Sequence, residues 1–130
     1  MNLDPIASVV QFLRSVPELP AGSVTGDLSA REVGDTTIYV AHDGGYRVER
    51  DSKLERVFVA YEVYSLDREQ AAQLAFLVRD HLLEGLRNGV TYKDLYFLDS
   101  RDQSLPDYEP DTSSREHVYC GEVSLYYQAA

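Results

Sequence analysis

One segment in the middle of the chain constrains the fold most, because a long apolar run leads directly into a long amphipathic one. The run Val57–Tyr64 is typical of a buried strand. Asp67 can then cap a helix through its carboxylate, and Gln70 three residues later completes a capping-box pattern. Asn88-Gly89 offers a left-handed residue to close that helix. The segment therefore predicts a buried strand followed by one dominant helix of about 20 residues, roughly 30 Å long.

This predicted helix has more apolar surface than one sheet contact requires. At about 100° per residue, one stripe should cover a sheet: Ala71, Leu74, Ala75, Val78, Leu82 and Leu86. The opposite side is polar, with Glu69, Gln73, Asp80 and Glu84. A further apolar group, Ala72, Phe76 and Leu83, lies about 100 to 140° from the first stripe. Either a neighbouring subunit or the N-terminal helix of the same subunit could cover this group, and the sequence leaves both readings open.

The N-terminal half adds a helix and two strands. Asp4 followed by Pro5 is a good helix opening, and apolar residues at helical spacing predict a helix over about 5–15. The segment Ser23–Leu28 is a weak strand candidate. Thr36–Ala41 is rich in β-branched and aromatic residues, so it predicts a strand that ends at the turn sequence 43–45.

The charged segment 46–56 and the C-terminal half complete the pattern. Residues 46–56 carry little apolar content and predict a solvated hairpin tip or mobile loop. Thr91–Leu98 and His117–Tyr127 predict two strands, and the second places four core candidates on one face: Tyr119, Val123, Leu125 and Tyr127. The acidic segment Asp99–Glu116, with two prolines, predicts a long loop that is either functional or disordered.

Together these elements predict a single α+β domain over residues 1–130. The expected order is α-β-β-β-α-β-β, with a mixed or antiparallel sheet of four to five strands and both helices on one face. The length of 130 residues suits one domain that can bury a core without a disulfide or metal. Cys120 is the single cysteine, so it is expected to be a small buried hydrophobe in a reducing compartment.

The charge balance limits the classes of partner. With 22 acidic and 12 basic residues, the net charge of −10 disfavours tight nucleic-acid binding and attraction to anionic lipid. No stretch approaches the roughly 18 apolar residues of a membrane helix, and the N-terminus lacks a basic signal region. Neither a membrane partner nor secretion is expected.

The usual signatures of catalysis and cofactor binding are missing from the sequence. It has no phosphate-binding glycine loop, no nucleophile elbow and no zinc-binding helix motif. Three histidines, His42, His81 and His117, fall on separate predicted elements, and Asp99–Asp102 lacks the spacing of a calcium loop. We therefore expect no enzyme, no cofactor and no metal. The ten tyrosines are better explained by packing than by base stacking, because no basic groove accompanies them.

Several motifs in this order resemble the tail terminator proteins of long-tailed, siphovirus-type bacteriophages. They are the opening Asp-Pro-Ile-Ala-x-Val-Val-x-Phe-Leu helix, an early Gly-x-Val strand, a Tyr-Val strand before Gly-Gly, and the unit Val-Tyr-Ser-Leu-Asp-Arg-Glu-Gln-Ala. The resemblance runs from Asp4 to Tyr127 and includes the acidic loop ahead of the last strand. Small neck proteins of the head-to-tail connector share a similar size and composition.

The resemblance implies a structural virion protein. Such a subunit forms a hexameric ring on the tail tube, ends tube polymerisation and presents a surface for head-tail joining. The implied partners are copies of itself, the major tail tube protein and the head-tail connector protein, without sequence-specific binding of nucleic acid. The implied location is the head-proximal end of the virion tail, after assembly in the host cytoplasm. A neck protein or a small acidic protein-binding module is the alternative.

Two groups of residues become candidates for assembly under this reading. Ala72, Phe76 and Leu83 are the candidate subunit interface. The acidic loop is expected to be poorly ordered in the free subunit and to become ordered against a neighbour or the tube. Its candidate contact residues are Asp107, Tyr108, Glu109 and Asp111.

Overall fold

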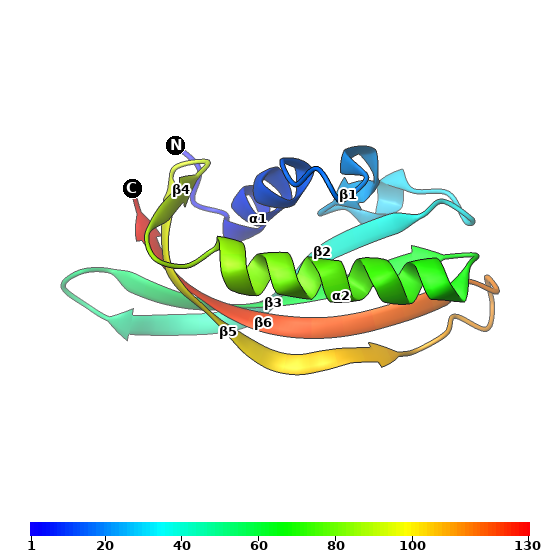
Figure 1. The fold of residues 1–130 in the computed structure, drawn as a ribbon. Helices are drawn as coiled ribbons and strands as arrows, with labels where there is room; N and C mark the ends of the chain where they lie inside the picture. Colours follow the sequence, from blue (N-terminus) through cyan, green and yellow to red (C-terminus); the bar gives the residue numbers. More distant parts are fainter.

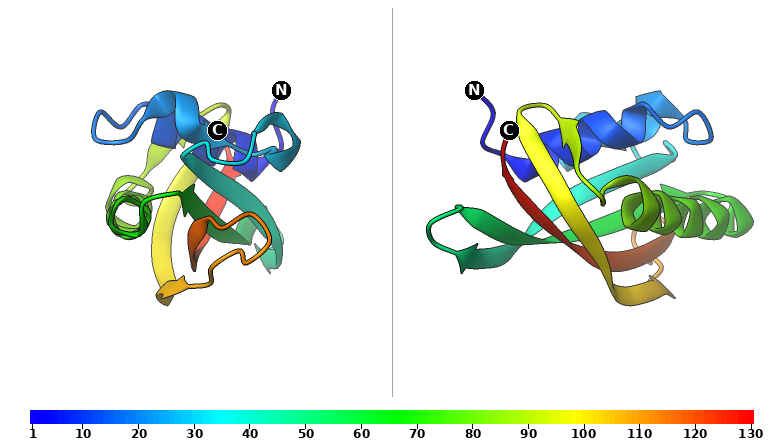
Figure 2. Two further views of the ribbon diagram at one scale, coloured as in Figure 1. Left: turned by 90° about the vertical axis from the view of Figure 1, so that its right-hand side faces the viewer. Right: turned by 60° about the vertical axis from the view of Figure 1, so that its left-hand side comes forward.

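The fold is a six-stranded curled sheet whose concave face holds both long helices (Figures 1 and 2). The computed structural model describes residues 1–130 apart from the side chain of Ala30. The helices are α1 (Pro5–Arg14) and α2 (Arg68–Gly85). The strands are β1 (Val24–Thr25), β2 (Thr37–Glu49), β3 (Leu54–Ser65), β4 (Val90–Tyr92), β5 (Leu95–Tyr108) and β6 (His117–Ala129). The α+β class and the placement of both helices on one face are confirmed, whereas the expected strand number was too low.

The strand order in the sheet is β1-β2-β3-β6-β5-β4. β1 is parallel to β2, and all other neighbours are antiparallel. β3 and β6 form the centre, with Tyr61 opposite Gly121. α2 packs over β3, β6 and β5, while α1 lies over β1, β2 and β4 (Figure 1). No helix in the described part of the chain is long and apolar enough to cross a membrane.

Both helices begin where their capping residues predict. The Asp4 carboxylate accepts a hydrogen bond from the Ile6 amide at 2.9 Å, and the Asp67 carboxylate accepts one from the Glu69 amide at 3.0 Å. The capping-box prediction at Gln70 is wrong, because the side-chain oxygen of Gln70 instead accepts from the Ser65 hydroxyl at 2.7 Å. That same hydroxyl accepts from the Asp67 amide, so Ser65 takes the role expected of Gln70.

α2 ends at Gly85, before the predicted stop at Asn88-Gly89. Both of those residues have positive φ, but their amides donate to the carbonyls of Leu98 and Phe97 on β5. They therefore turn the chain into β4 rather than close the helix. The predicted core stripe is confirmed, since all six residues from Ala71 to Leu86 are buried. The predicted polar side is exposed.

β2 continues through the predicted turn at Gly44-Gly45 as a β-bulge between His42 and Gly45. Gly45 has φ of 152°, and a Cβ there would lie 2.1 Å from the Arg56 carbonyl oxygen, so the chain can pass this close only with glycine. The reversal comes later, after Glu49 and before Leu54. Residues 46–56 are therefore a hairpin tip, as one of the two readings predicted. Within Ser23–Leu28, the weak strand candidate, only Val24–Thr25 forms a strand.

The predicted strand Thr91–Leu98 is in fact a tight hairpin. Lys93 and Asp94 have φ of 45° and 71° and form its two-residue turn between β4 and β5. Neither is glycine, so the usual sequence signal for such a turn is missing. This turn adds the strand that the predicted element order lacks.

The largest error concerns Asp99–Glu116, which is not one long loop. β5 runs on to Tyr108, and this extension pairs with β6 as far as Tyr119. The pairing contains bulges, including one between Ser104 and Asp107 that accommodates Pro106. The strand is held by backbone pairing along one side, although most of its side chains are exposed. Only residues 109–116 connect β5 to β6, and the predicted disorder of residues 100–108 is wrong.

Candidate functional site

The predicted interface residues lie on α2, and contacts on the two sides of this helix show which way they face. On one side, His81 Nε2 lies 2.8 Å from a carboxylate oxygen of Glu18, in the loop after α1. The ring of Phe12 on α1 lies against Gly85. On the other side, Arg79 pairs with Asp102 on β5. One side of α2 therefore faces α1 and its following loop, and the other faces the β5 edge.

Ala72, Phe76 and Leu83 lie on the β5 side, three to seven residues from Arg79 along the same helix face. Covering of this group by the N-terminal helix, one of the two alternatives, is therefore wrong. Leu83 packs partly into the core, whereas Phe76 keeps 39% of its surface exposed. The structure thus leaves an apolar patch centred on Phe76.

The surface around Phe76 is acidic. Glu69, Asp80 and Glu84 are exposed on the same outer side of α2. The nearby arginines are already engaged, since Arg79 pairs with Asp102 and Arg87 pairs with Glu84 at 2.7 Å. The patch therefore combines one exposed aromatic ring with unbalanced negative charge, which suits a partner carrying apolar and basic side chains.

The predicted assembly residues at the end of β5 are fixed in place by local contacts. The hydroxyl of Tyr108 and Nδ1 of His117 are hydrogen-bonded at 2.7 Å, and the Arg68 guanidinium lies 3.9 Å from the centre of the Tyr108 ring. The Glu109 amide donates to the Val118 carbonyl, and the Asp111 carboxylate accepts from the Ser113 amide. Asp107 lies opposite Cys120 in the sheet. The four predicted residues are thus near one another, two of them in β5 and two in the turn after it.

A buried ion pair anchors this turn to the segment between β1 and β2. The Arg31 guanidinium donates to both carboxylate oxygens of Glu116, which is only 2% exposed. The Gly34 amide donates to the same carboxylate at 3.2 Å, and Arg31 also donates to the Thr37 hydroxyl. Hydrogen bonding to Arg31 holds the pKa of Glu116 below its ordinary value, and the same bond raises the pKa of Arg31. Because the pair spans 85 residues, no local sequence signal could have predicted it.

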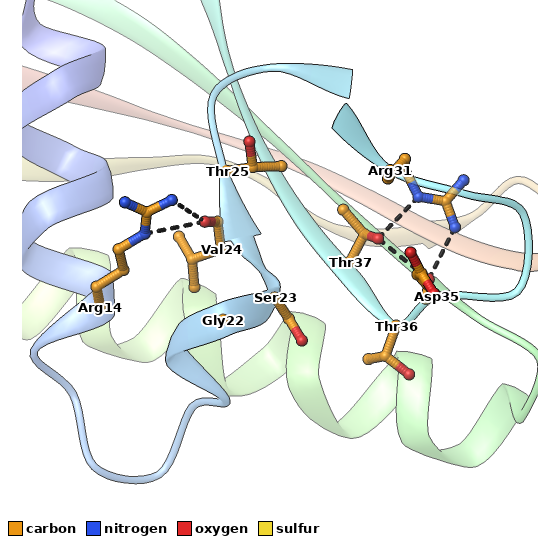
Figure 3. A pocket seen from close by; sticks show the side chains of 9 residues that line it. All are labelled: Arg14, Gly22, Ser23, Val24, Thr25, Arg31, Asp35, Thr36 and Thr37. Atoms are coloured by element: carbon orange, nitrogen blue, oxygen red, sulfur yellow. Dashed lines mark hydrogen bonds between the residues drawn. The ribbon is translucent and has the colours of Figure 1, made fainter. Parts of the chain in front are cut away.

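A cavity of about 440 Å³ lies beside this ion pair, between the end of α1 and the start of β2 (Figure 3). Two arginines reach into it from different elements. Arg14 donates to the Val24 carbonyl at 2.8 Å and 3.1 Å, and Arg31 donates to the Asp35 carbonyl at 2.8 Å. These bonds hold neighbouring elements together: Arg14 ties the end of α1 to β1, and Arg31, which also pairs with Glu116, ties the segment before β2 to the β5–β6 turn.

No helix of the described chain covers the convex face of the sheet (Figure 2). The central part of this face is acidic. Asp43, Asp107, Glu109 and Glu122 line a shallow hollow of about 430 Å³ there. Hydrogen bonding to Asp43, together with burial, raises the pKa of Glu122 to about 7. Burial and neighbouring carboxylates raise the pKa of the half-buried Cys120 thiol to about 12, so this thiol stays protonated.

Toward the hairpin tip, the same face carries an arginine packed among aromatic rings. The Arg56 guanidinium lies 4.8 Å from the Phe58 ring centre, 5.4 Å from that of Tyr126 and 5.7 Å from that of Tyr46. It also donates to the Tyr46 hydroxyl at 2.7 Å. The alternating charges of this segment gave no sign of this cluster, because it forms only when β2, β3 and β6 pair.

The histidines are separated, as the sequence predicted. His42 Nδ1 accepts from the Gly44 amide, while His81 and His117 contact Glu18 and Tyr108. Among the described residues, no group of three or more His, Cys, Asp or Glu side chains is arranged to hold a metal ion. Asp102, in the segment Asp99–Asp102 that lacks calcium-loop spacing, is paired with Arg79.

Comparison with known proteins gives a similarity in fold. No protein-family model matches the sequence, and no curated protein matches it. The structure is similar to a chain from the virion of a native gene transfer agent particle, with a TM-score of 0.70 and 12% sequence identity. The similarity covers 94% of this chain and 92% of that chain. The fold of the whole chain is therefore also that of a virion component.

Proposed function

We propose that this chain is a structural virion protein, a tail terminator that forms a ring on the tail tube and ends its polymerisation. The observation that carries the proposal is the fold similarity to a virion chain over nearly the full length of both chains. The sequence motifs that resemble tail terminators support the same role. The chain acts by binding partners and catalyses no reaction, at the head-proximal end of the tail.

The surfaces of the molecule suit such a role. A ring subunit needs at least one exposed surface that a neighbour covers, and the Phe76 patch offers an apolar one. Ala72 and Leu83 border that patch and belong to the proposed subunit interface. Asp107, Tyr108, Glu109 and Asp111 form an ordered acidic corner, which we assign to contact with the tube or the connector protein.

Net charge supports a further part of the role. A ring whose subunits each carry a charge of −10 repels phosphates, so a duplex passing through it slides instead of binding. Micromolar affinity for duplex DNA at physiological salt would contradict this part of the proposal.

The direct test is to add the purified chain to polymerising tail tube protein and to measure tube lengths by electron microscopy. A terminator shortens the length distribution and appears at one end of each tube. A neck protein would leave tube length unchanged and bind the head-tail connector instead. An acidic binding module with another target would do neither, and the proposed function would then be wrong.

A further inference from the structure

The hairpin tip, residues 46–56, forms an arm that projects from the sheet (Figure 1). β6 accompanies β3 only as far as the pair Glu55 and Tyr127, so beyond this point the arm is a two-stranded ribbon. Residues 46–53 are all exposed. An isolated two-stranded ribbon is marginally stable in water, so the arm gains from being covered by a partner.

The arm differs from the rest of the chain in charge and in exposed apolar surface. It carries four basic residues (Arg47, Arg50, Lys53 and Arg56) and three acidic ones (Glu49, Asp51 and Glu55), in a chain whose net charge is −10. Tyr46 and Val48 are 53% and 44% exposed. The arm is therefore a mildly basic element with apolar side chains at its surface.

The outer side of α2 has the complementary properties. Phe76 is exposed there among Glu69, Asp80 and Glu84, and both arginines nearby are paired within the subunit. The arm cannot satisfy this surface in its own subunit, because it extends past the C-terminal end of α2 (Figure 1). Two complementary surfaces at different places on one chain produce head-to-tail contacts, which close into a ring or continue as a filament.

We propose that the arm of one copy lies across the outer side of α2 of the next copy. Tyr46 and Val48 then cover Phe76, and Arg50 and Lys53 lie beside the carboxylates of Glu69 and Asp80, because Glu84 is already paired with Arg87. This inference rests on the proposed function, in that it names the two surfaces that join neighbours in the ring.

The test uses two full-length variants, each with one surface broken. Val48→Glu places a charge in the arm, and Phe76→Glu places one on α2, where burying an unpaired charge is costly. Val33→Glu is the matched control, since Val33 is 69% exposed on a loop outside both surfaces. Circular dichroism verifies that each variant is folded, and native mass spectrometry gives the oligomeric state.

We expect rings from the wild type and from Val33→Glu, and monomers from each broken variant alone. An equimolar mixture of Val48→Glu and Phe76→Glu should give a dimer and nothing larger, because only one intact pair of surfaces is then available. A wild type that stays monomeric, or a ring formed by Val48→Glu, overturns the inference.

Cross-linking tests the same contact when the dimer is too weak to isolate. A chain carrying V48C, F76C and C120S should give a ladder of disulfide-linked oligomers on oxidation. The corresponding V33C, F76C and C120S chain should give none, and equal ladders from both chains overturn the inference. Failure of the proposed function is a separate result: rings that form through the arm but do not shorten tail tubes leave the arm contact standing and exclude the terminator role.

Discussion

The two faces of the curled sheet differ in how deeply their side chains are buried. On the concave face, β3 and β6 side chains are buried beneath α2, as Tyr61, Val123 and Leu125 show. On the convex face, the Phe58 and Tyr126 rings pack against Arg56 and against the exposed residues Tyr46 and Arg101, and the middle of the face is acidic. The concave face therefore supplies stability through apolar burial, while the convex face lies open to solvent and contributes less.

The largest expected effect comes from removing a large side chain on the concave face. Tyr61 is fully buried, and its hydroxyl has no hydrogen-bond partner among the described residues, so packing alone holds it. Tyr61→Ala should lower the free energy of unfolding by about 4 kcal/mol through lost burial and the cavity left behind. Chemical denaturation measures this. Phe58→Ala, on the same strand but on the convex face, should cost about 1 kcal/mol, and equal losses would contradict the contrast between the faces.

Removing the buried ion pair should have the next largest effect. Glu116→Ala leaves the Arg31 guanidinium without its main acceptor, so stability should fall by about 3 kcal/mol. The matched variant Glu55→Ala breaks the pair with Arg47, half of whose side chain is exposed, and should cost under about 1 kcal/mol. If the Glu55 variant loses as much stability as the Glu116 variant, the anchoring role of the buried pair is wrong.

The sequence predicted the buried elements of the concave face better than the exposed elements. The apolar run of β3 and the helical stripe of α2 are local patterns, and both predicted buried elements correctly. The extension of β5 could not be predicted from local pattern. Residues 101–105 are all exposed, and four of the five are polar, so they show no apolar alternation. They form a strand because their backbone pairs with β6. The Phe76 patch was visible in the sequence, but only the tertiary position of α1 shows that Phe76 stays uncovered.

The dependence of stability on pH should have opposite slopes at two carboxylates. The pKa of Glu122 is raised to about 7 from an ordinary 4.5, so the folded state holds a proton that the unfolded state releases. Its contribution is complete below pH 4.5 and is lost as pH rises through 7. The pKa of Glu116 is lowered, so its contribution is present above pH 4.5 and is lost as pH falls below that value.

Thermal melting of the wild type, of Glu122→Gln and of the exposed-site control Glu69→Gln across this range separates the two contributions. Glu122→Gln should remove the loss of stability between pH 4.5 and 7, an effect under about 1 kcal/mol because water screens the convex face. The Glu69→Gln profile should follow the wild type. A Glu122→Gln profile that also follows the wild type would show that folding does not raise the pKa of Glu122.

The smallest expected effect on stability, and the most direct test of the central claim, is at Phe76. Because its ring is exposed in the subunit, Phe76→Glu should change the free energy of unfolding by no more than about 0.5 kcal/mol. We expect a variant that melts like the wild type by circular dichroism, fails to form rings, and leaves tail tubes overlong in electron micrographs. A variant that melts normally and still limits tube length would contradict the claim that this surface joins neighbouring subunits.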